Sequence, residues 1–354
     1  MHRLSIVAQG KPGIWGGEME TTDDRQALIL LMRGFQISRA IRVAADLGIA
    51  DRIAAEGRRP VDELAAECAV QADPLLRCLR ALASFGIFRV DDDRRVAHSP
   101  RSLLLRAEAA DSLHAAARFY TAPGSWRAWE ALDEALVGRV PHEAAWGTSR
   151  FEYLRGHPEE ARRFDHYMAC FPDRHHQAIA EAYDFSACRT AVDVGGGAGE
   201  TLRRILARHP AMTATVLDRQ DVVEAIPAAL LLGGRIRAQA GDCFEAIPAG
   251  ADLYLLVRVL HDCPDADGRR LLRTCRQAMA PGSRLLIGEQ ILDPDPSRGS
   301  PASYLVDLQM MAMFGSARER TEAEFQALLA AADFHFLRTI ATASSISIIE
   351  AEPT

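Results

Sequence analysis

Acidic or imidazole side chains follow five short apolar runs in the second half of the chain. They are Asp193, Asp218, Asp242, His261 and Glu289. Strands that alternate with helices form a mostly parallel sheet, and the carboxyl ends of its strands meet along one edge. We therefore expect these side chains to face a common crevice. A histidine there can take a proton from a hydroxyl group, because a carboxylate on its second ring nitrogen fixes the tautomer and stabilises the imidazolium. Taken alone, His261 also fits a structural histidine at a strand end.

A glycine-rich turn lies just after Asp193. The run Gly195-Gly-Gly197-Ala-Gly-Glu200 joins an apolar strand to a helix. Glycine lets the backbone approach a ligand closely, and the start of the helix offers unpaired N–H groups. A dinucleotide site would have glycine in place of Glu200. An acid beside the turn repels a pyrophosphate but attracts a ligand with an amino group and a sulfonium cation. The turn alone also fits a generic nucleotide-binding domain. Asp218 is placed to bind ribose hydroxyls or, alternatively, to begin a surface loop.

Composition narrows the classes of function. The chain has 354 residues, of which 48% are hydrophobic and 25% charged, and this predicts two domains of ordinary globular type. A net charge of -7 argues against a nucleic-acid partner, because phosphate binding needs a basic surface. The seven cysteines are widely spaced without a Cys-x-x-Cys pair, so we expect reduced thiols in the cytoplasm and no zinc site. No apolar run approaches the roughly 18 residues that a membrane span needs.

The first third of the chain predicts a helical domain. Residues 1–24 are glycine-rich and are typical of a flexible arm, and residues 25–110 follow the helix, turn, helix and hairpin pattern of a winged helix. The helix expected from Gln26 to Leu47 is apolar nearly all round, so it must be buried on most sides, either within the chain or in a partner subunit. Binding to DNA is disfavoured, because the second helix presents chiefly Arg77 and Arg80 and the hairpin tip carries three aspartates.

Residues 111–186 are predicted to be helical, and residues 187–354 carry the strand and helix alternation. Within the helical part, Phe164, Met168 and Phe171 share one helical face, which fits core packing or the wall of an apolar pocket. The adjacent His175 and His176 point about 100° apart on a helix, and no third ligand follows at metal spacing. We therefore expect both histidines to face solvent, and we expect no metal site.

The pattern Asp-x-Gly-x-Gly-x-Gly, which begins at Asp193, resembles motif I of S-adenosylmethionine-dependent methyltransferases. Three further runs resemble the small-molecule O-methyltransferases of the plant caffeate and bacterial polyketide type: Gly241–Pro248, Arg258-Val-Leu-His261-Asp262 and Glu319-Arg-Thr-Glu322. The resemblance extends from Asp24 to the C-terminus. It implies an α/β fold, in which a Rossmann-like methyltransferase domain with a mostly parallel sheet follows a mainly α winged-helix dimerisation domain. It also implies S-adenosylmethionine as cofactor, a hydroxylated small-molecule acceptor and a homodimer formed through the N-terminal domain.

The resemblance also assigns roles to single residues. It makes His261 the general base, flanked and oriented by Glu289 and Glu319. It assigns the cofactor to a second set of residues: Asp193, Gly195, Gly197, Asp218, Asp242, Cys243, Phe244 and Arg258. It places the acceptor against a third set: Met168, Asp307, Met310, Met313 and Phe314.

One position departs from the family. Its members usually follow His-Asp with a tryptophan that covers the adenine, and this chain has Cys263 there. The methionine-rich run 308–314 suggests a bulky or flexible apolar acceptor. O-methylation is the leading hypothesis. The alternatives are an enzyme of the same scaffold that methylates nitrogen or carbon, or uses the cofactor without methyl transfer, and a cofactor-sensing DNA-binding regulator.

Overall fold

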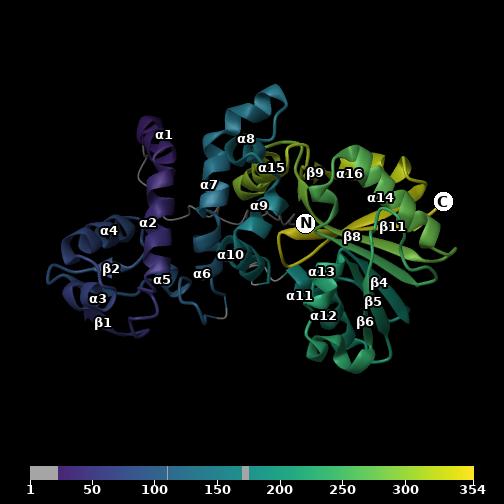
Figure 1. Ribbon diagram of the computed structural model, residues 1–354, viewed down its shortest axis with the longest axis horizontal. Coiled ribbons are helices and arrows are strands. Elements are labelled where there is room, and N and C mark those ends of the chain that lie inside the picture. The colour runs from purple at the N-terminus through teal and green to yellow at the C-terminus, as the bar shows by residue number, and fades with distance from the viewer. Residues whose placement is uncertain (1–22, 110, 170–174) are drawn as a thin grey trace, which may run out of the picture. The chain divides into compact units, whose positions relative to one another are not determined.

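The computed structural model describes residues 23–109, 111–169 and 175–354 (Figure 1). The predicted arm at residues 1–24 lies almost wholly outside this range, and so does Phe171. The chain divides into two compact units, Met1–Thr121 and Ala122–Thr354. None of the helices in the described residues is long and apolar enough to cross a bilayer.

The first unit combines helices with a small antiparallel sheet. Its helices are α1 (Asp24–Met32), α2 (Gly34–Asp46), α3 (Val61–Glu67), α4 (Ala72–Ser84), α5 (Pro100–Leu103) and α6 (His114–Phe119). Its strands β1 (Arg58–Pro60), β2 (Arg89–Val90) and β3 (Arg95–Ala97) pair in the order β1-β3-β2. Leu64, Leu79 and Val96 join α3, α4 and β3 in one buried core. Helix, turn, helix and hairpin therefore follow one another as a winged-helix pattern predicts.

The N-terminal helix differs from its prediction. The chain bends at Arg33, so the expected single helix is two, and no residue of α1 is buried. Leu31 is 73% exposed, and Leu28, Met32 and Phe35 are also exposed. The first unit therefore does not bury α1, and of the two ways of burial that the sequence allows, burial in a partner subunit stays a prediction.

The division at Thr121 falls later than the predicted boundary at residue 110. The reason is α6, which packs on α2: the ring nitrogen Nε2 of His114 lies 3.2 Å from the carbonyl oxygen of Ala45, and Arg118 pairs with Asp46 at 2.7 Å. These contacts attach the residues after 110 to the first unit.

The second unit begins with helices and ends with the large sheet. Its first helices are α7 (Pro123–Glu130), the 3₁₀ helix η1 (Leu132–Val137), α8 (Pro141–Trp146), α9 (Arg150–Gly156), α10 (Pro158–Ala169) and α11 (His175–Ala182). His175 is only 4% exposed, and Nδ1 of His176 lies 2.7 Å from Oγ1 of Thr201. The expectation that both histidines face solvent is therefore wrong, because α11 packs against α12 (Glu200–Arg208).

The sheet has the strand order β10-β11-β8-β7-β4-β5-β6, and β9 pairs with β8. Its strands are β4 (Thr190–Val194), β5 (Thr213–Asp218), β6 (Ile236–Ala240), β7 (Leu253–Val257), β8 (Arg284–Leu292), β9 (Arg320–Thr321), β10 (Phe334–Ala341) and β11 (Ile346–Pro353). Strands β4 to β8 run parallel, whereas β10 and β11 pair antiparallel, so the sheet is mostly parallel as predicted.

Helices cover both faces of this sheet (Figure 1). One face packs on α14 (Asp265–Ala278) and α16 (Glu322–Ala330), and the other packs on α11 and α12. The remaining elements are α13 (Gln220–Glu224), α15 (Pro301–Phe314) and the 3₁₀ helices η2 (Ala228–Gly234) and η3 (Leu260–Asp262). With both faces covered, the free edge formed by the carboxyl ends of β4 to β8 is where polar side chains can collect.

Candidate active site

The glycine turn after β4 lies against the end of β5. Gly195 and Gly197 have φ of 69° and 56°, a conformation that side chains with a Cβ rarely adopt. The N–H of Gly195 donates to the carbonyl of Leu217 at 2.8 Å, and the N–H of Gly197 donates to Oδ2 of Asp218 at 2.8 Å. The turn and the predicted ribose-binding carboxylate thus form one structure.

Asp193 lies buried beneath this turn. It is 1% exposed, and neither carboxylate oxygen has a hydrogen-bond partner among the described residues. Burial and then the nearby Asp218 raise the pKa of Asp193 to about 7. A Cβ on Gly196 would meet Cγ of Asp193 at 2.6 Å, so glycine is required there. A buried acid without a partner fits a cationic amine as ligand, because a charged group in such a place needs an opposite charge.

The loop after β6 carries the residues predicted to meet the adenine. Asp242 is exposed, and its Oδ1 accepts the N–H of Phe244 at 2.8 Å. The guanidinium carbon of Arg270 on α14 lies 4.9 Å from the centre of the Phe244 ring, which holds the ring in place. Cys243 and Cys263 both pack into or against the core on this side of the sheet.

His261 lies in η3, directly after β7, and it is 5% exposed. Its Nδ1 lies 2.9 Å from Oε2 of Glu289, which projects from β8. The other oxygen of Glu289, Oε1, accepts the backbone N–H groups of Val259 and Leu260, both at 2.9 Å. The same carboxylate therefore fixes the loop and the ring, as the sequence predicts for a His-carboxylate pair. The second ring nitrogen, Nε2, lies 3.2 Å from Oδ1 of Asp262.

The charges around His261 favour its protonated form. Burial and then Arg258 lower the pKa of His261, but Glu289 and Asp262 outweigh them and raise it to about 10. Burial raises the pKa of Glu289, and His261 then brings it below its usual value. The carboxylates beside both ring nitrogens thus favour the imidazolium form of His261 at neutral pH.

Glu319 is the residue directly before β9, and it belongs to the same cluster. It is almost fully buried, its Oε1 accepts from Nη1 of Arg258 at 3.0 Å, and its N–H donates to Oδ1 of Asp307 at 2.8 Å. Asp307, predicted on the acceptor side, thus holds the backbone of Glu319. The structure places the Arg258 guanidinium against the carboxylates of Glu319 and Glu289, and the predicted contact of Arg258 with the cofactor stays a prediction.

Arg320 was missed by the sequence reasoning. It is 1% exposed, and it donates to the carbonyl oxygens of Leu260 and Cys263, both at 2.7 Å. It also pairs with Asp265 at 2.8 Å. Arg320 therefore fastens both ends of the His261 segment. Its place between Glu319 and the helix cap at Thr321 was the only signal in the sequence.

One group of metal-type donors is present among the described residues. Ligand atoms of His261, Glu289 and Glu319 all lie within 4.8 Å of one another. Nη1 of Arg258 lies 3.0 Å from Glu319 and 3.5 Å from Glu289, so a positive charge is already in place between the carboxylates. The expected absence of a metal stays a prediction.

Four of the five residues predicted to contact the acceptor lie on α15, which packs against α7 and α9: Asp307, Met310, Met313 and Phe314. Nε1 of Trp129 donates to Oε1 of Gln309 at 2.8 Å, and Met313 is buried in a cluster with Ala128. The rings of Phe151 and Phe314 stack at 5.5 Å. Met310 lies half-buried on the same helix as Met313 and Phe314. Of the predicted acceptor contacts, Phe314 is thus joined to a neighbouring ring, whereas Met313 contributes to packing between α7 and α15.

Two other features border this region. The guanidinium of Arg219, the residue after Asp218, lies 5.7 Å from the Phe151 ring, so Phe151 connects the end of β5 to α15. Met168 lies on α10 with 40% of its surface exposed, and its role in a pocket stays a prediction.

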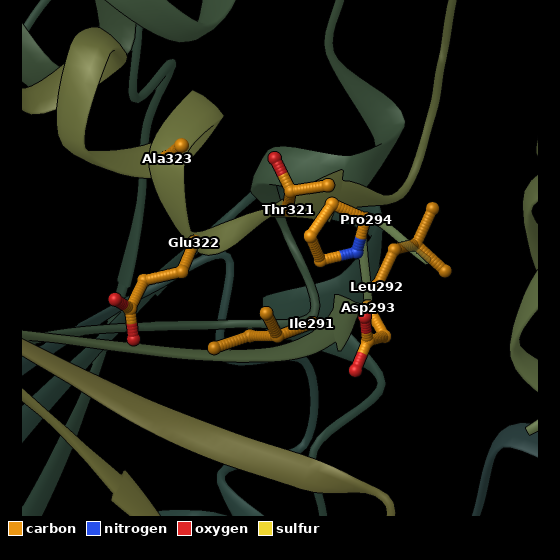
Figure 2. Close-up of a pocket in the computed structure, with 7 residues that line it drawn as sticks. All are labelled: Ile291, Leu292, Asp293, Pro294, Thr321, Glu322 and Ala323. Carbon is orange, nitrogen blue, oxygen red and sulfur yellow. The ribbon is translucent and has the colours of Figure 1, made fainter. Parts of the chain in front are cut away.

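A separate hollow lies where β8 ends and α16 begins, and Figure 2 shows the residues around it. It is lined by Ile291, Leu292, Asp293, Pro294, Thr321, Glu322 and Ala323. None of these belongs to the predicted site, and the two ionisable groups among them are acidic.

Comparison with known proteins agrees with this geometry. An O-methyltransferase domain model matches residues 129–335, and an O-methyltransferase dimerisation domain model matches residues 29–108. A phenazine O-methyltransferase of Lysobacter antibioticus is 36% identical over 330 residues, covering 92% of this chain and 95% of that protein. A mitomycin biosynthesis 6-O-methyltransferase of Streptomyces lavendulae is 37% identical over 306 residues, covering 84% of this chain and 86% of that protein.

Solved structures give the same result. A mitomycin 7-O-methyltransferase has a TM-score of 0.85 at 34% identity, covering 94% of this chain and 98% of that one. An O-methyltransferase from neocarzinostatin biosynthesis, solved with S-adenosylmethionine and 2-hydroxy-5-methyl naphthoic acid, has a TM-score of 0.76 at 31% identity, covering 90% of this chain and 96% of that one. The chain belongs to the O-methyltransferase family of S-adenosylmethionine-dependent methyltransferases.

Proposed function

We propose that this enzyme transfers a methyl group from S-adenosylmethionine to a hydroxyl group of an aromatic or polyketide-like small molecule, with His261 as the general base. The observation that carries this proposal is the 2.9 Å contact between His261 Nδ1 and the buried Glu289, which makes Nε2, the nitrogen beside Asp262, the one to exchange a proton with the acceptor. Relatives named for phenazine and mitomycin O-methylation support the acceptor class.

The chemistry requires a base because a hydroxyl is a poor nucleophile. When bound, S-adenosylmethionine supplies an electrophilic methyl group on a sulfonium. A phenol has a pKa near 10, as tyrosine does, so forming its anion at pH 7 costs about 4 kcal/mol. A histidine that accepts this proton as the bond forms offsets that cost. Glu289 holds the ring and stabilises the imidazolium that results.

Methylation of nitrogen is the second candidate. A phenazine-1-carboxylate N-methyltransferase of Pseudomonas aeruginosa is 34% identical over 317 residues, covering 88% of this chain. A ring nitrogen that carries no proton would need no base, so loss of His261 would matter little. The mass of the product and the position of the added methyl group distinguish the two reactions.

The substitution His261→Ala tests the base. We expect the variant to bind S-adenosylmethionine as the parent does, while kcat falls about 100-fold to 10,000-fold, the range for loss of a general base. Calorimetry gives the affinity, and transfer of labelled methyl to a panel of phenols gives kcat. His335→Ala is the control, because His335 is exposed on the edge strand β10, which β11 and β8 separate from β7. Unchanged turnover in His261→Ala would remove the base assignment.

The charge of His261 leads us to predict how many protons are released when a ligand binds. An imidazolium with a pKa of about 10 must lose its proton before it can act as a base. A second positive charge in the crevice disfavours the imidazolium, so the pKa of His261 falls when S-adenosylmethionine binds. S-adenosylhomocysteine has the same ammonium but a neutral sulfur. At pH 8 we expect more proton release with the former ligand than with the latter.

Calorimetry in two buffers with different ionisation enthalpies measures this difference. The comparison subtracts any proton that Asp193, with its pKa of about 7, releases to the buffer when the ammonium that both ligands share binds beside it. His261→Ala should abolish the difference between the two ligands. Equal proton release by both ligands in the parent protein would show that His261 does not sense the sulfonium.

Adjacent glycines in the turn give a matched test of the cofactor site. In Gly196→Ala the new Cβ would lie 2.6 Å from Cγ and Oδ2 of Asp193. A steric clash of this kind costs about 3 kcal/mol. We therefore expect the affinity for the cofactor to fall by 100-fold or more, or the protein not to fold. In Gly197→Ala the Cβ meets nothing within 4 Å, and only its positive φ is unfavourable, by about 1–2 kcal/mol. Calorimetry and thermal melting rank the two, and the reverse order would contradict the turn geometry.

We also propose that the enzyme is a homodimer formed through the dimerisation domain. The exposed apolar residues of α1 and the start of α2 need cover, and a second copy of the domain supplies it. Light scattering should show a dimer for the parent and a monomer for the double variant Leu31→Glu with Phe35→Glu. Leu136→Glu, at an exposed position in the second unit, is the control and should remain dimeric. A monomeric parent would contradict the proposal.

A further inference from the structure

Arg258 lies at the centre of the cluster around His261. Its side chain is 12% exposed, and those of Glu289 and Glu319 are fully buried. Nη1 lies 3.0 Å from Oε1 of Glu319 and 3.5 Å from Oε2 of Glu289. That Oε2 is the same oxygen that lies 2.9 Å from Nδ1 of His261. The imidazole and the guanidinium therefore share one carboxylate oxygen.

The backbone at Arg258 is shaped to deliver this side chain. Its φ is +57°, which is unfavourable for a residue with a Cβ. Its N–H donates to the carbonyl oxygen of Gly288 at 3.0 Å, one residue before Glu289. Such a conformation persists where surrounding contacts over-determine it, and it is common at functional sites. Here it turns the chain between β7 and η3 at the point where the guanidinium meets the carboxylates.

A permanent cation at this point solves a problem of charge. Two buried carboxylates close together need a positive partner, because a buried charge without one is strongly destabilising. His261 is such a partner only while it is protonated, and a base must spend part of each cycle neutral. Arg258 keeps its charge at every pH of interest, so Glu289 and Glu319 stay in place in both states of the ring.

The same three residues, His261, Glu289 and Glu319, have their ligand atoms within 4.8 Å of one another, as metal ligands do. A guanidinium that contacts both carboxylates repels a divalent cation from this position. We propose that Arg258 is a positioning residue that serves as the internal cation of the base cluster: it holds Glu289 and Glu319 around His261 and occupies the place that a divalent metal would otherwise take. This inference rests on the proposed function, because it assigns a role within the same site.

The main test compares Arg258→Met with the parent enzyme. We expect kcat to fall about 10-fold to 100-fold, the usual loss when a residue that orients a catalytic group is removed. The Kd for S-adenosylmethionine should stay within a factor of about 3, which is less than 1 kcal/mol. The variant should also gain a site for Co²⁺, seen as visible absorption bands of a bound ion that the parent lacks. The inference requires both the loss of kcat and the gain of Co²⁺ binding, and the absence of either overturns it.

The pH profile separates positioning from simple structural support. Without Arg258, His261 faces the acidic groups Glu289, Glu319 and Asp262 with no cation beside them, so the acidic limb of the kcat profile should move to higher pH. A profile with an unmoved limb would contradict the inference. A large rise in the Kd for S-adenosylmethionine with parental kcat at saturation would also overturn it. That result would instead support the predicted contact between Arg258 and the cofactor.

Two further variants keep the test decisive if Arg258→Met does not fold. Arg258→Lys keeps the positive charge but replaces the forked guanidinium with a compact ammonium. We expect its kcat to lie between that of the parent and that of inactive protein. The double variant Arg258→Met with Glu319→Gln removes both partners, so no carboxylate at position 319 is left unpaired, and we expect it to fold. Parental kcat in the double variant overturns the inference.

Arg338→Met is the matched control. Arg338 is an exposed arginine on the edge strand β10, and it pairs with Glu350 at 2.7 Å. Its variant therefore loses an ion pair that lies away from the base cluster. We expect this variant to keep parental kcat and to bind no Co²⁺. The Co²⁺ measurement needs no turnover. If the parent transfers no methyl group to any acceptor, the proposed function fails, whereas the inference is still judged by whether Co²⁺ binds to Arg258→Met and not to the parent.

Discussion

The carboxylate of Glu289 is the contact on which the rest of the site depends. One oxygen accepts backbone N–H groups from the loop after β7, and the other meets the imidazole of His261. The parallel pairing of β7 with β8, in which Val257 lies opposite Gly288, brings the two segments together. Because this carboxylate is fully buried, it cannot exchange these partners for water. A single side chain therefore fixes both the loop and the orientation of the ring.

The carboxyl ends of β4 and β5 follow the same principle, because the buried acid there also needs a cation. Beneath the glycine turn, the two carboxylate oxygens of Asp193 find no hydrogen-bond partner in the described part of the chain, and Asp218 accepts the N–H of Gly197 from the neighbouring strand. The cofactor of this family carries an ammonium and a sulfonium, so its charges complement those of the protein. Since Arg258 and the protonated His261 together balance Glu289 and Glu319, the negative charge left for the ligand lies mainly at the β4 and β5 ends.

Strand ends made much of this arrangement predictable. An acid or imidazole after each apolar run indicates a parallel sheet edge, and the structure brings His261, Glu289 and Glu319 together as the resemblance implied. The family comparison confirms the fold class and the cofactor. These predictions succeed because the alternation of strands with helices and the glycine turn both depend on residues that are close together in the sequence.

Other features depend on contacts that spacing does not encode. Arg258 follows a buried strand and was assigned to the cofactor, but the direction of its side chain depends on a positive φ and on Glu319, 61 residues away. The exposure of α1 depends on whether a second chain is present, and the burial of His175 depends on how α11 meets α12. The sequence predicts an acceptor contact for Met313 because it lies in the methionine-rich run 308–314, on the helix that the resemblance places beside the acceptor, and only packing shows that Met313 faces α7.

Arg320 fastens the His261 segment by bonds to the carbonyl oxygens of Leu260 and Cys263, and both it and Glu319 belong to the sheet side of the unit. Trp129 and Phe151, which contact α15, come from helices that precede the sheet in the chain. Helix α15 connects them to the base cluster, because its Asp307 also holds the backbone of Glu319. Substitutions on α7 and α9 can therefore change the surroundings of Phe314, while Glu289 and Arg320, which hold His261, lie elsewhere in the chain.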